Sequence, residues 1–238
     1  MSKFKSWLII LLNFLLIAAS AISLYFMWVR QFDDNITAWR MFFYVNIDAA
    51  IVLSIAAVTM IISAIQFLIQ KRPNLHFLKY AYTFKMIATV WEVFVFLLAI
   101  IVGPWTAFKS IIFTQEQVIL NIVLPLCATA IFIFLEYKKT NWKVIFYSVI
   151  PQIIYIFLII GTIYTGTCQK ALGQEAPYEI FFFKSHPVTS AFSTIGLVVA
   201  TLVIGIGIYF ANWAMFEKAY PRLATMRYQR ELLKFKTH

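Results

Sequence analysis

Six long apolar runs, separated by short polar connections, dominate this chain of 238 residues. A helix needs about 20 apolar residues to cross the roughly 30 Å hydrocarbon core of a bilayer, and each run is long enough. The runs do not alternate polar and apolar residues with a period of two, so they favour helices over the strands of a barrel. The predicted spans are residues 7–29, 41–69, 81–103, 117–136, 143–165 and 190–213.

The composition excludes the other common classes of protein. Apolar residues make up 62% and charged residues 13% of the chain, whereas a soluble domain has roughly 45–50% and about 25%. A soluble globular fold, a disordered chain, a coiled coil and a disulfide scaffold are therefore not expected. We predict an all-α integral membrane bundle of six transmembrane helices.

The first run has a second possible interpretation, as a signal peptide. Lys3 and Lys5 form a basic start, and residues 19–21 (Ala-Ser-Ala) resemble a cleavage site. Apolar residues continue to Val29, however, which is too long for a typical signal core. We expect the run to stay in the protein as its first span.

The net charge of +10 allows either a nucleic-acid or a membrane partner. Because the basic residues cluster at the ends of the apolar runs, the membrane interpretation is favoured and no nucleic acid is expected. If the runs are spans, fourteen Lys and Arg lie on one side and five on the other. The positive-inside rule then predicts that both termini are cytoplasmic.

The C-terminal residues 217–238 form a second predicted unit after the transmembrane domain of residues 1–216. Their apolar and basic residues are arranged as in a short amphipathic surface helix, which anionic lipids would attract. An arm that docks on a partner subunit is the alternative. The predicted membrane-surface residues are Arg222, Arg227, Arg230 and Lys234.

Polar side chains inside the spans are costly in lipid, so they are the candidate functional residues. By depth, those in spans two to five fall in the middle or predicted outer half of the bilayer. We hypothesise one polar pocket there, although hydrogen bonds that merely join the helices are an equal alternative. Lys85 is expected to snorkel to the nearby surface. The candidate ligand-binding residues are Asp48, Glu92, Asn121, Gln152 and Asn46.

The fifth connection, residues 166–189, contains three consecutive phenylalanines, Phe181, Phe182 and Phe183. Three such residues outside a span would not stay in water. We favour an aromatic belt at the level of the headgroups over a flap that covers a cavity.

Motifs for familiar chemistry are missing. The chain has no phosphate-binding G-x-x-x-x-G-K-[ST], no G-x-S-x-G elbow and no H-E-x-x-H. Its histidines, His76, His186 and His238, are scattered over connections and tail. We therefore predict no metal site, no cofactor and no catalytic residue, and lean towards a protein that is not an enzyme.

Several segments carry a family resemblance. Residues 41–48 (Met-Phe-Phe-Tyr-Val-Asn-Ile-Asp), 120–125 (Leu-Asn-Ile-Val-Leu-Pro), 136–139 (Glu-Tyr-Lys-Lys) and 177–183 (Pro-Tyr-Glu-Ile-Phe-Phe-Phe) occur in this order. They resemble segments of six-helix bacterial membrane proteins of the Pr6Pr type, relatives of the androgen-induced lipid hydrolases. The resemblance covers most of residues 40–215 and implies a six-helix fold in a bacterial cytoplasmic membrane.

The same resemblance implies that hydrolysis has been lost. The hydrolases use a Thr in span two and a His in span four, where this chain has Tyr44 and Asn121. An asparagine amide cannot act as a general base.

These observations predict a multi-pass membrane protein that is a non-catalytic membrane subunit or a lipid- or amphiphile-binding protein. Membrane lipids, and other membrane subunits, are the expected partners. A transporter or the substrate-capturing subunit of one is the first alternative, and a divergent intramembrane lipid hydrolase is the second.

Overall fold

The computed structural model describes residues 3–33, 44–69, 75–101, 114–138, 141–172, 175–176 and 181–220. Within these ranges the chain forms helices and turns and no strand. In the described part of the chain, six helical segments are long and apolar enough to cross a membrane, which is compatible with a polytopic membrane protein. The prediction of an all-α fold with six long apolar helices is thus confirmed.

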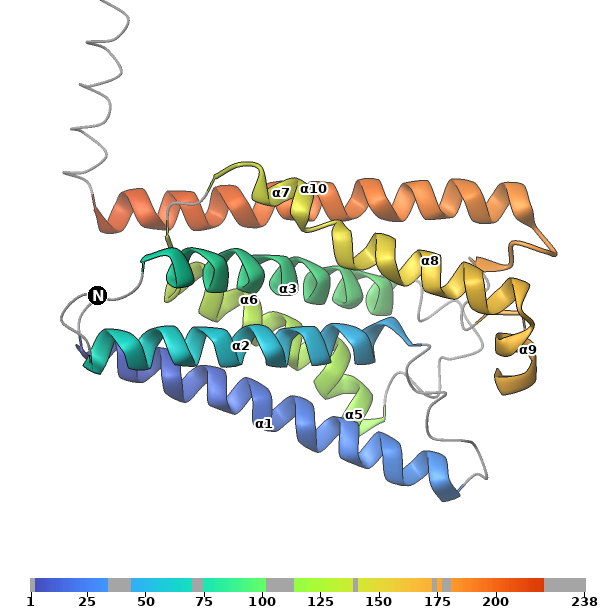
Figure 1. Cartoon of the computed structure of the whole chain (residues 1–238), viewed down its shortest axis with the longest axis horizontal. Helices are drawn as coiled ribbons and strands as arrows, with labels where there is room; N and C mark the ends of the chain where they lie inside the picture. Colours follow the sequence, from blue (N-terminus) through green and yellow to red (C-terminus); the bar gives the residue numbers. More distant parts are fainter. Residues whose placement is uncertain are drawn as a thin grey trace, which may run out of the picture.

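Four of the six segments are built from single helices: α1 (Lys3–Asp33), α2 (Val45–Ile69), α3 (Leu75–Ile101) and α10 (Pro187–Ala219). The fourth segment joins α5 (Gln115–Val118), the π-helix η3 (Ile119–Val123) and α6 (Leu124–Phe134). The fifth joins α7 (Val144–Tyr147) and α8 (Ile150–Tyr164), and the short α9 (Thr167–Leu172) follows it. Figure 1 shows the long helices running along one common direction.

The observed helices and the predicted spans differ mainly at their ends. α3 begins at Leu75 rather than at residue 81, and α10 runs past both predicted limits to Ala219. The boundary predicted at residue 216 therefore falls inside a helix. Residues 221–238, and with them Arg222, Arg227, Arg230 and Lys234 of the predicted surface helix, lie outside the described residues.

The bundle has two ends, which we name by the chain. The terminal end contains the start of α1 and the end of α10, and the opposite end contains the end of α1 and the start of α10 (Figure 1). The charge count predicts that the terminal end faces the cytoplasm.

Helix α3 is the centre of the bundle. It packs against α2, α6 and α10, and also against η3, α7 and α8. Half of the residues in the most apolar stretch of α3 are buried, compared with 17% of those in the corresponding stretch of α10. Most of the surface of α10 is therefore left for lipid or other contacts. A polar residue on α3 is consequently the most isolated from the surroundings.

Two prolines interrupt helices where their missing N–H groups predict a break. Pro125 lies in the first turn of α6, which follows the π-helix η3. At the end of η3 the Leu124 amide donates to the Ile119 carbonyl, five residues earlier. Pro151 lies in the first turn of α8, which follows the turn at residues 148–149 that separates it from α7. Because π-helical turns often occur at functional sites, the position of Asn121 within η3 is of interest.

Candidate functional site

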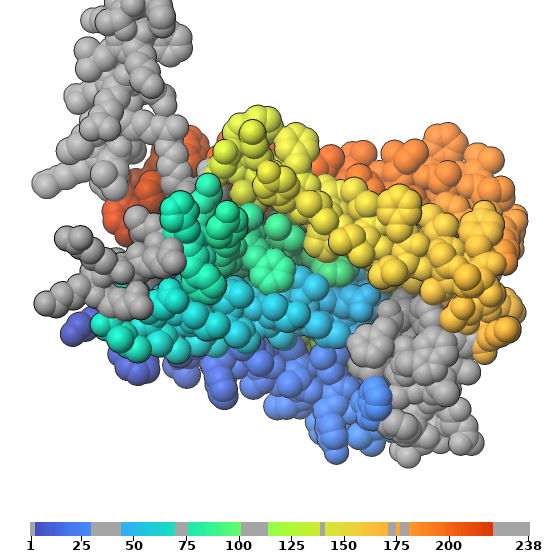
Figure 2. Space-filling view, in the orientation of Figure 1, coloured from blue at the N-terminus to red at the C-terminus, as the bar shows by residue number. Residues whose placement is uncertain are grey.

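A groove of about 470 Å³ lies on the outside of the bundle, between α2 on one side and α7 and α8 on the other, with α3 as its floor. In Figure 2 the surface of α3 is visible between these two walls. Ile154 and Leu158 of α8 are 54% and 62% exposed, so the groove opens outwards, towards lipid if the helices span a membrane. Its lining is apolar and aromatic apart from one carboxyl, and includes Asp48, Ile51, Ile87, Trp91, Ile154 and Leu158.

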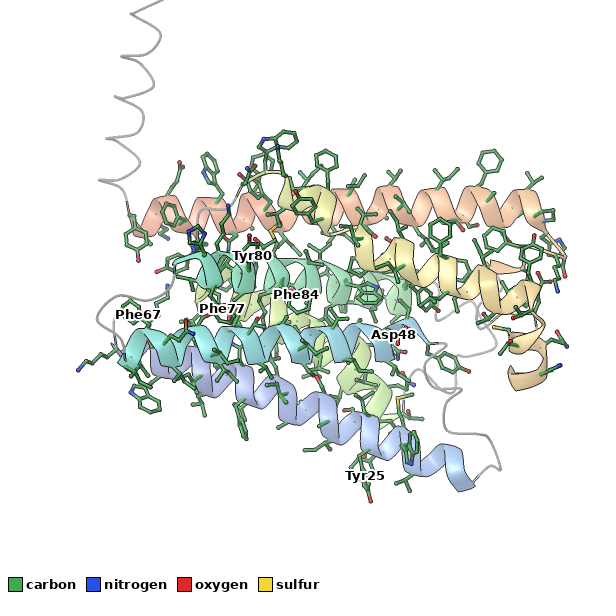
Figure 3. All side chains as sticks on the ribbon, viewed as in Figure 1. Tyr25, Asp48, Phe67, Phe77, Tyr80 and Phe84 are labelled. Carbon is green, nitrogen blue, oxygen red and sulfur yellow. The ribbon has the colours of Figure 1, made fainter. Side chains whose placement is uncertain are left out.

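Asp48 supplies that carboxyl from the first turn of α2. In Figure 3, Asp48 lies towards the opposite end of the bundle. Phe84, another lining residue, is seen on the same face, closer to the terminal end. Its side chain is half-buried, and none of the described residues hydrogen-bonds to the carboxyl. A carboxyl beside an apolar groove can bind a cationic or hydrogen-bond-donating group whose remainder is apolar.

Two other predicted residues, Asn46 and Asn121, meet in a network of amides. The Nδ2 atoms of both donate to Oε1 of Gln117, at 2.8 Å and 3.0 Å. The Nε2 of Gln117 in turn points to the sulfur of Met27 at 3.6 Å. The network joins α1, α2 and the α5–η3 segment, as the hydrogen-bond alternative expected. Sequence reasoning missed Gln117 because it lies at the predicted start of its span, where polar residues are common and do not indicate a site.

Gln152 is 2% exposed and joins α8 to α10, because its Oε1 accepts a hydrogen bond from the Thr201 hydroxyl. Its Nε2 has no partner among the described residues. The cavity beside it has a volume of about 10 Å³, which is room for one water at most. We find no space for a larger ligand there.

Glu92 of α3 is completely buried, and neither carboxyl oxygen has a hydrogen-bond partner among the described residues. Lys85, two turns earlier on the same helix, is the charged group that acts on it electrostatically. Trp91, the residue before Glu92, lines the groove, but Glu92 itself does not.

Lys85 does not snorkel, contrary to the expectation from sequence. Its side chain is 0% exposed, and its Nζ donates to Oδ1 of Asn13 on α1 at 2.7 Å. The Nδ2 of Asn13 donates to Oε1 of Glu136, just beyond α6, at 2.5 Å. The helices packed around α3 close off the route to the surface that an isolated helix would leave open. Asn13 and Glu136 were missed, although a polar residue inside the first span was a visible signal.

The five predicted residues therefore do not share one chamber. Asp48 lines the groove, Asn46 and Asn121 bind Gln117, Gln152 binds Thr201, and Glu92 is buried on α3 without lining the groove.

The phenylalanine run packs against the opposite end of the bundle; its predicted place in an aromatic belt at the headgroups stays a prediction. Phe181 is 4% exposed, with its ring 6.2 Å from that of Tyr155 and stacked on that of Phe183 at 6.5 Å. Glu175 anchors the segment, because its carboxylate accepts hydrogen bonds from the Lys184 and Ser185 amides and from the Ser185 hydroxyl. Burial alone would raise the pKa of Glu175, but these hydrogen bonds together hold it below its ordinary value.

The described residues contain no group of three or more His, Cys, Asp or Glu that could hold a metal ion. Among known proteins, no family model, no curated protein and no solved structure matches the chain.

Proposed function

We propose that this chain is a multi-pass protein of a bacterial cytoplasmic membrane that binds a lipid or other amphiphile with an ammonium headgroup. The groove is the observation that carries the proposal: it is apolar and outward-facing, and it ends at a carboxyl to which none of the described residues hydrogen-bonds. Its volume of about 470 Å³ lies within the roughly 300–1,000 Å³ of small-molecule sites.

The length of the groove suits one acyl chain. Its lining runs from Phe84 to Trp91 along α3 and from Ile150 to Leu158 along α8. At 1.5 Å per residue these stretches are about 10–12 Å long. Half of a roughly 30 Å hydrocarbon core is about 15 Å, so the groove follows a chain through most of one leaflet.

The head is chosen by charge. Asp48 attracts an ammonium group and repels a phosphate that has no compensating cation. The aromatic rings of Trp91 and Tyr155, which also line the groove, favour a cation nearby. A lipid with a primary amine, such as phosphatidylethanolamine, fits these two requirements.

The protein is proposed to bind its lipid without hydrolysing it. Asn121 has no basic nitrogen, and its amide is already engaged with Gln117.

Native mass spectrometry tests the proposal by comparing how much lipid the purified protein retains from two preparations. One contains amine-headed lipids, and the other contains anionic lipids without an amine or choline headgroup. Asp48→Asn keeps the shape and removes the charge, and losing a charge-assisted hydrogen bond of about 1.5–3 kcal/mol lowers affinity roughly tenfold or more. Glu217→Gln, on α10 and outside the groove lining, is the matched control and is expected to retain the lipid.

A second pair of variants tests the groove itself. Ile154→Trp fills it, whereas Ile153→Trp places the same bulk on an exposed residue of α8 that does not line it. The proposal is wrong if wild type retains no amine-headed lipid, or if both tryptophan variants retain as much as wild type.

Transport is the second candidate, because a buried network of ionisable groups is typical of transporters and pumps. If the protein moves its amphiphile between leaflets, proteoliposomes containing it will exchange a fluorescent amine-headed lipid faster than empty vesicles. Equal rates would leave binding alone as the function.

A further inference from the structure

The buried charges around α3 form a connected set that the groove does not use. Lys85 binds Asn13, and Asn13 binds both Glu136 and the carbonyl of Ile9. The set thereby links α3 to α1 and to the end of α6. Lys85 and Asn13 are 0% exposed and Glu136 is 2% exposed, so water does not screen these groups.

Glu92 extends the set towards the middle of the bundle. It lies seven residues after Lys85, which corresponds to about 10 Å along the helix. Lys85 acts electrostatically on both Glu136 and Glu92, but its ammonium is bonded on the side of Glu136. One ammonium thus stands between two buried carboxyls.

The side chains of Lys85 and Glu92 tilt in the same direction along α3. Helical side chains tilt towards the N-terminus of their helix, which for α3 is at the terminal end. Lys85 accordingly reaches towards Asn13 and Glu136, and Glu92 tilts back towards Lys85. A lysine has a flexible four-carbon stem and a compact charge, so it can exchange one partner for the other.

The two carboxyls differ in the groups that surround them. Glu136 has the Lys85–Asn13 pair on one side, and Lys5 of α1 also acts on it. Lys5 is half-buried, with its Nζ 3.6 Å from the centre of the Tyr137 ring. None of the described residues donates to either oxygen of Glu92, and a buried carboxylate in that condition is far less favourable than a carboxylic acid.

We propose that Glu92 is a proton-binding site inside the membrane bundle, and that Lys85 turns from Glu136 to Glu92 when the proton leaves. With the proton bound, Glu92 is neutral and Lys85 balances Glu136. Without it, the Glu92 carboxylate takes the Lys85 ammonium, and Lys5 remains beside Glu136. The proton exchanges with water, and no other reactant is needed.

Few other titratable groups can interfere. The elements in closest contact with α3 are α2, η3, α6, α7, α8 and α10, and α1 reaches it through the bond between Asn13 and Lys85. The basic residues on these elements are Lys3, Lys5 and Arg30 of α1 and Lys218 at the last turn of α10. η3 has no titratable residue; the other titratable residues on these elements are Tyr25, Asp33, Asp48, Cys127, Tyr147, Tyr155, Tyr164, Tyr209 and Glu217.

Infrared spectroscopy of the full chain in lipid bilayers tests the site, because a protonated carboxyl has a C=O stretch that a carboxylate lacks. We expect wild type to show this band at about pH 7 and to lose it as the pH rises. Glu92→Gln removes the band, whereas Glu217→Gln and Asp48→Asn leave the Glu92 band in place. Glu92→Asp retains a shifted band, so the test holds even if the glutamine variant fails to fold.

The role of Lys85 has its own readout. In Lys85→Met the departing proton would leave an unpaired carboxylate, so the band persists to a higher pH than in wild type. The proposal is overturned if wild type has no titrating band, if Glu92→Gln leaves that band intact, or if Lys85→Met does not move its titration.

Discussion

Asn13 is predicted to be one of the most sensitive positions in the chain, because Asn13→Ala disconnects two buried charges at once. The side chain accepts from Lys85 at 2.7 Å and donates to Glu136 at 2.5 Å. Breaking a buried charge network by removing one member costs about 3–5 kcal/mol. A neutral interhelical hydrogen bond in a membrane protein contributes only about 0.6 kcal/mol on average. We therefore expect a loss of about 3–5 kcal/mol in the free energy of unfolding.

Ser20→Ala is the matched control, on the same helix and equally buried. Ser20 is 1% exposed, and its hydroxyl donates only to the Leu16 carbonyl one turn earlier. Its removal should cost about 1 kcal/mol or less, because no charge loses a partner.

Unfolding in mixed micelles can be followed through the thiol of Cys168, which is 0% exposed, in a Cys127→Ser background. The fraction of Cys168 that reacts with an alkylating reagent reports the unfolded population as denaturing detergent increases. Equal losses for Asn13→Ala and Ser20→Ala would refute the reasoning, since the network would then contribute no more than a neutral bond. The triple change Asn13→Leu, Lys85→Met and Glu136→Gln should recover part of the loss, because it leaves no buried charge.

Three further predictions concern packing and the opposite end. A Cβ on Gly205 would lie 2.9 Å from Oγ of Ser148, whereas one on Gly207 meets nothing within 4 Å. We therefore expect Gly205→Val to lower the midpoint of unfolding, measured through Cys168 as above, and Gly207→Val to leave it unchanged. Because the pKa of Glu175 is lowered, its hydrogen bonds stabilise residues 181–186 at any pH above the ordinary pKa of a glutamate, and they are lost as the pH falls through the lowered value. Hydrogen exchange of the Ser185 amide, corrected for the intrinsic rate of exchange, should then accelerate. Burial raises the pKa of the Cys168 thiol, so its alkylation in the folded protein should need a higher pH than that of a free thiol, and an equal pH profile would contradict its buried position.

The candidate site was predictable only in part. A polar residue in an apolar run is visible in the sequence, and Asp48, Asn121 and Gln152 were identified by that signal alone. Depth was a poor guide to their neighbours, however, because it ignores the rotation of each helix about its axis. Asp48 came to face the groove while Glu92, at a similar depth, came to face the interior.

Lys85 shows the same limit from another direction. Its place about four residues inside the predicted edge of its span suggested snorkelling, which assumes an open path along the helix. The helices around α3 remove that path, and Asn13, which is 72 positions away in the chain, provides a partner instead.

The count, length and helical nature of the apolar segments were contained in the sequence, because a run of about 20 apolar residues satisfies its own backbone only as a helix in lipid. Charge placement likewise predicts which end lies in the cytoplasm. Which polar groups meet was decided by the tertiary structure alone, since Asn13 and Glu136 are 123 positions apart and touch only because α1 and α6 pack together. The groove arose in the same way, from the space that α2 and α8 leave above α3.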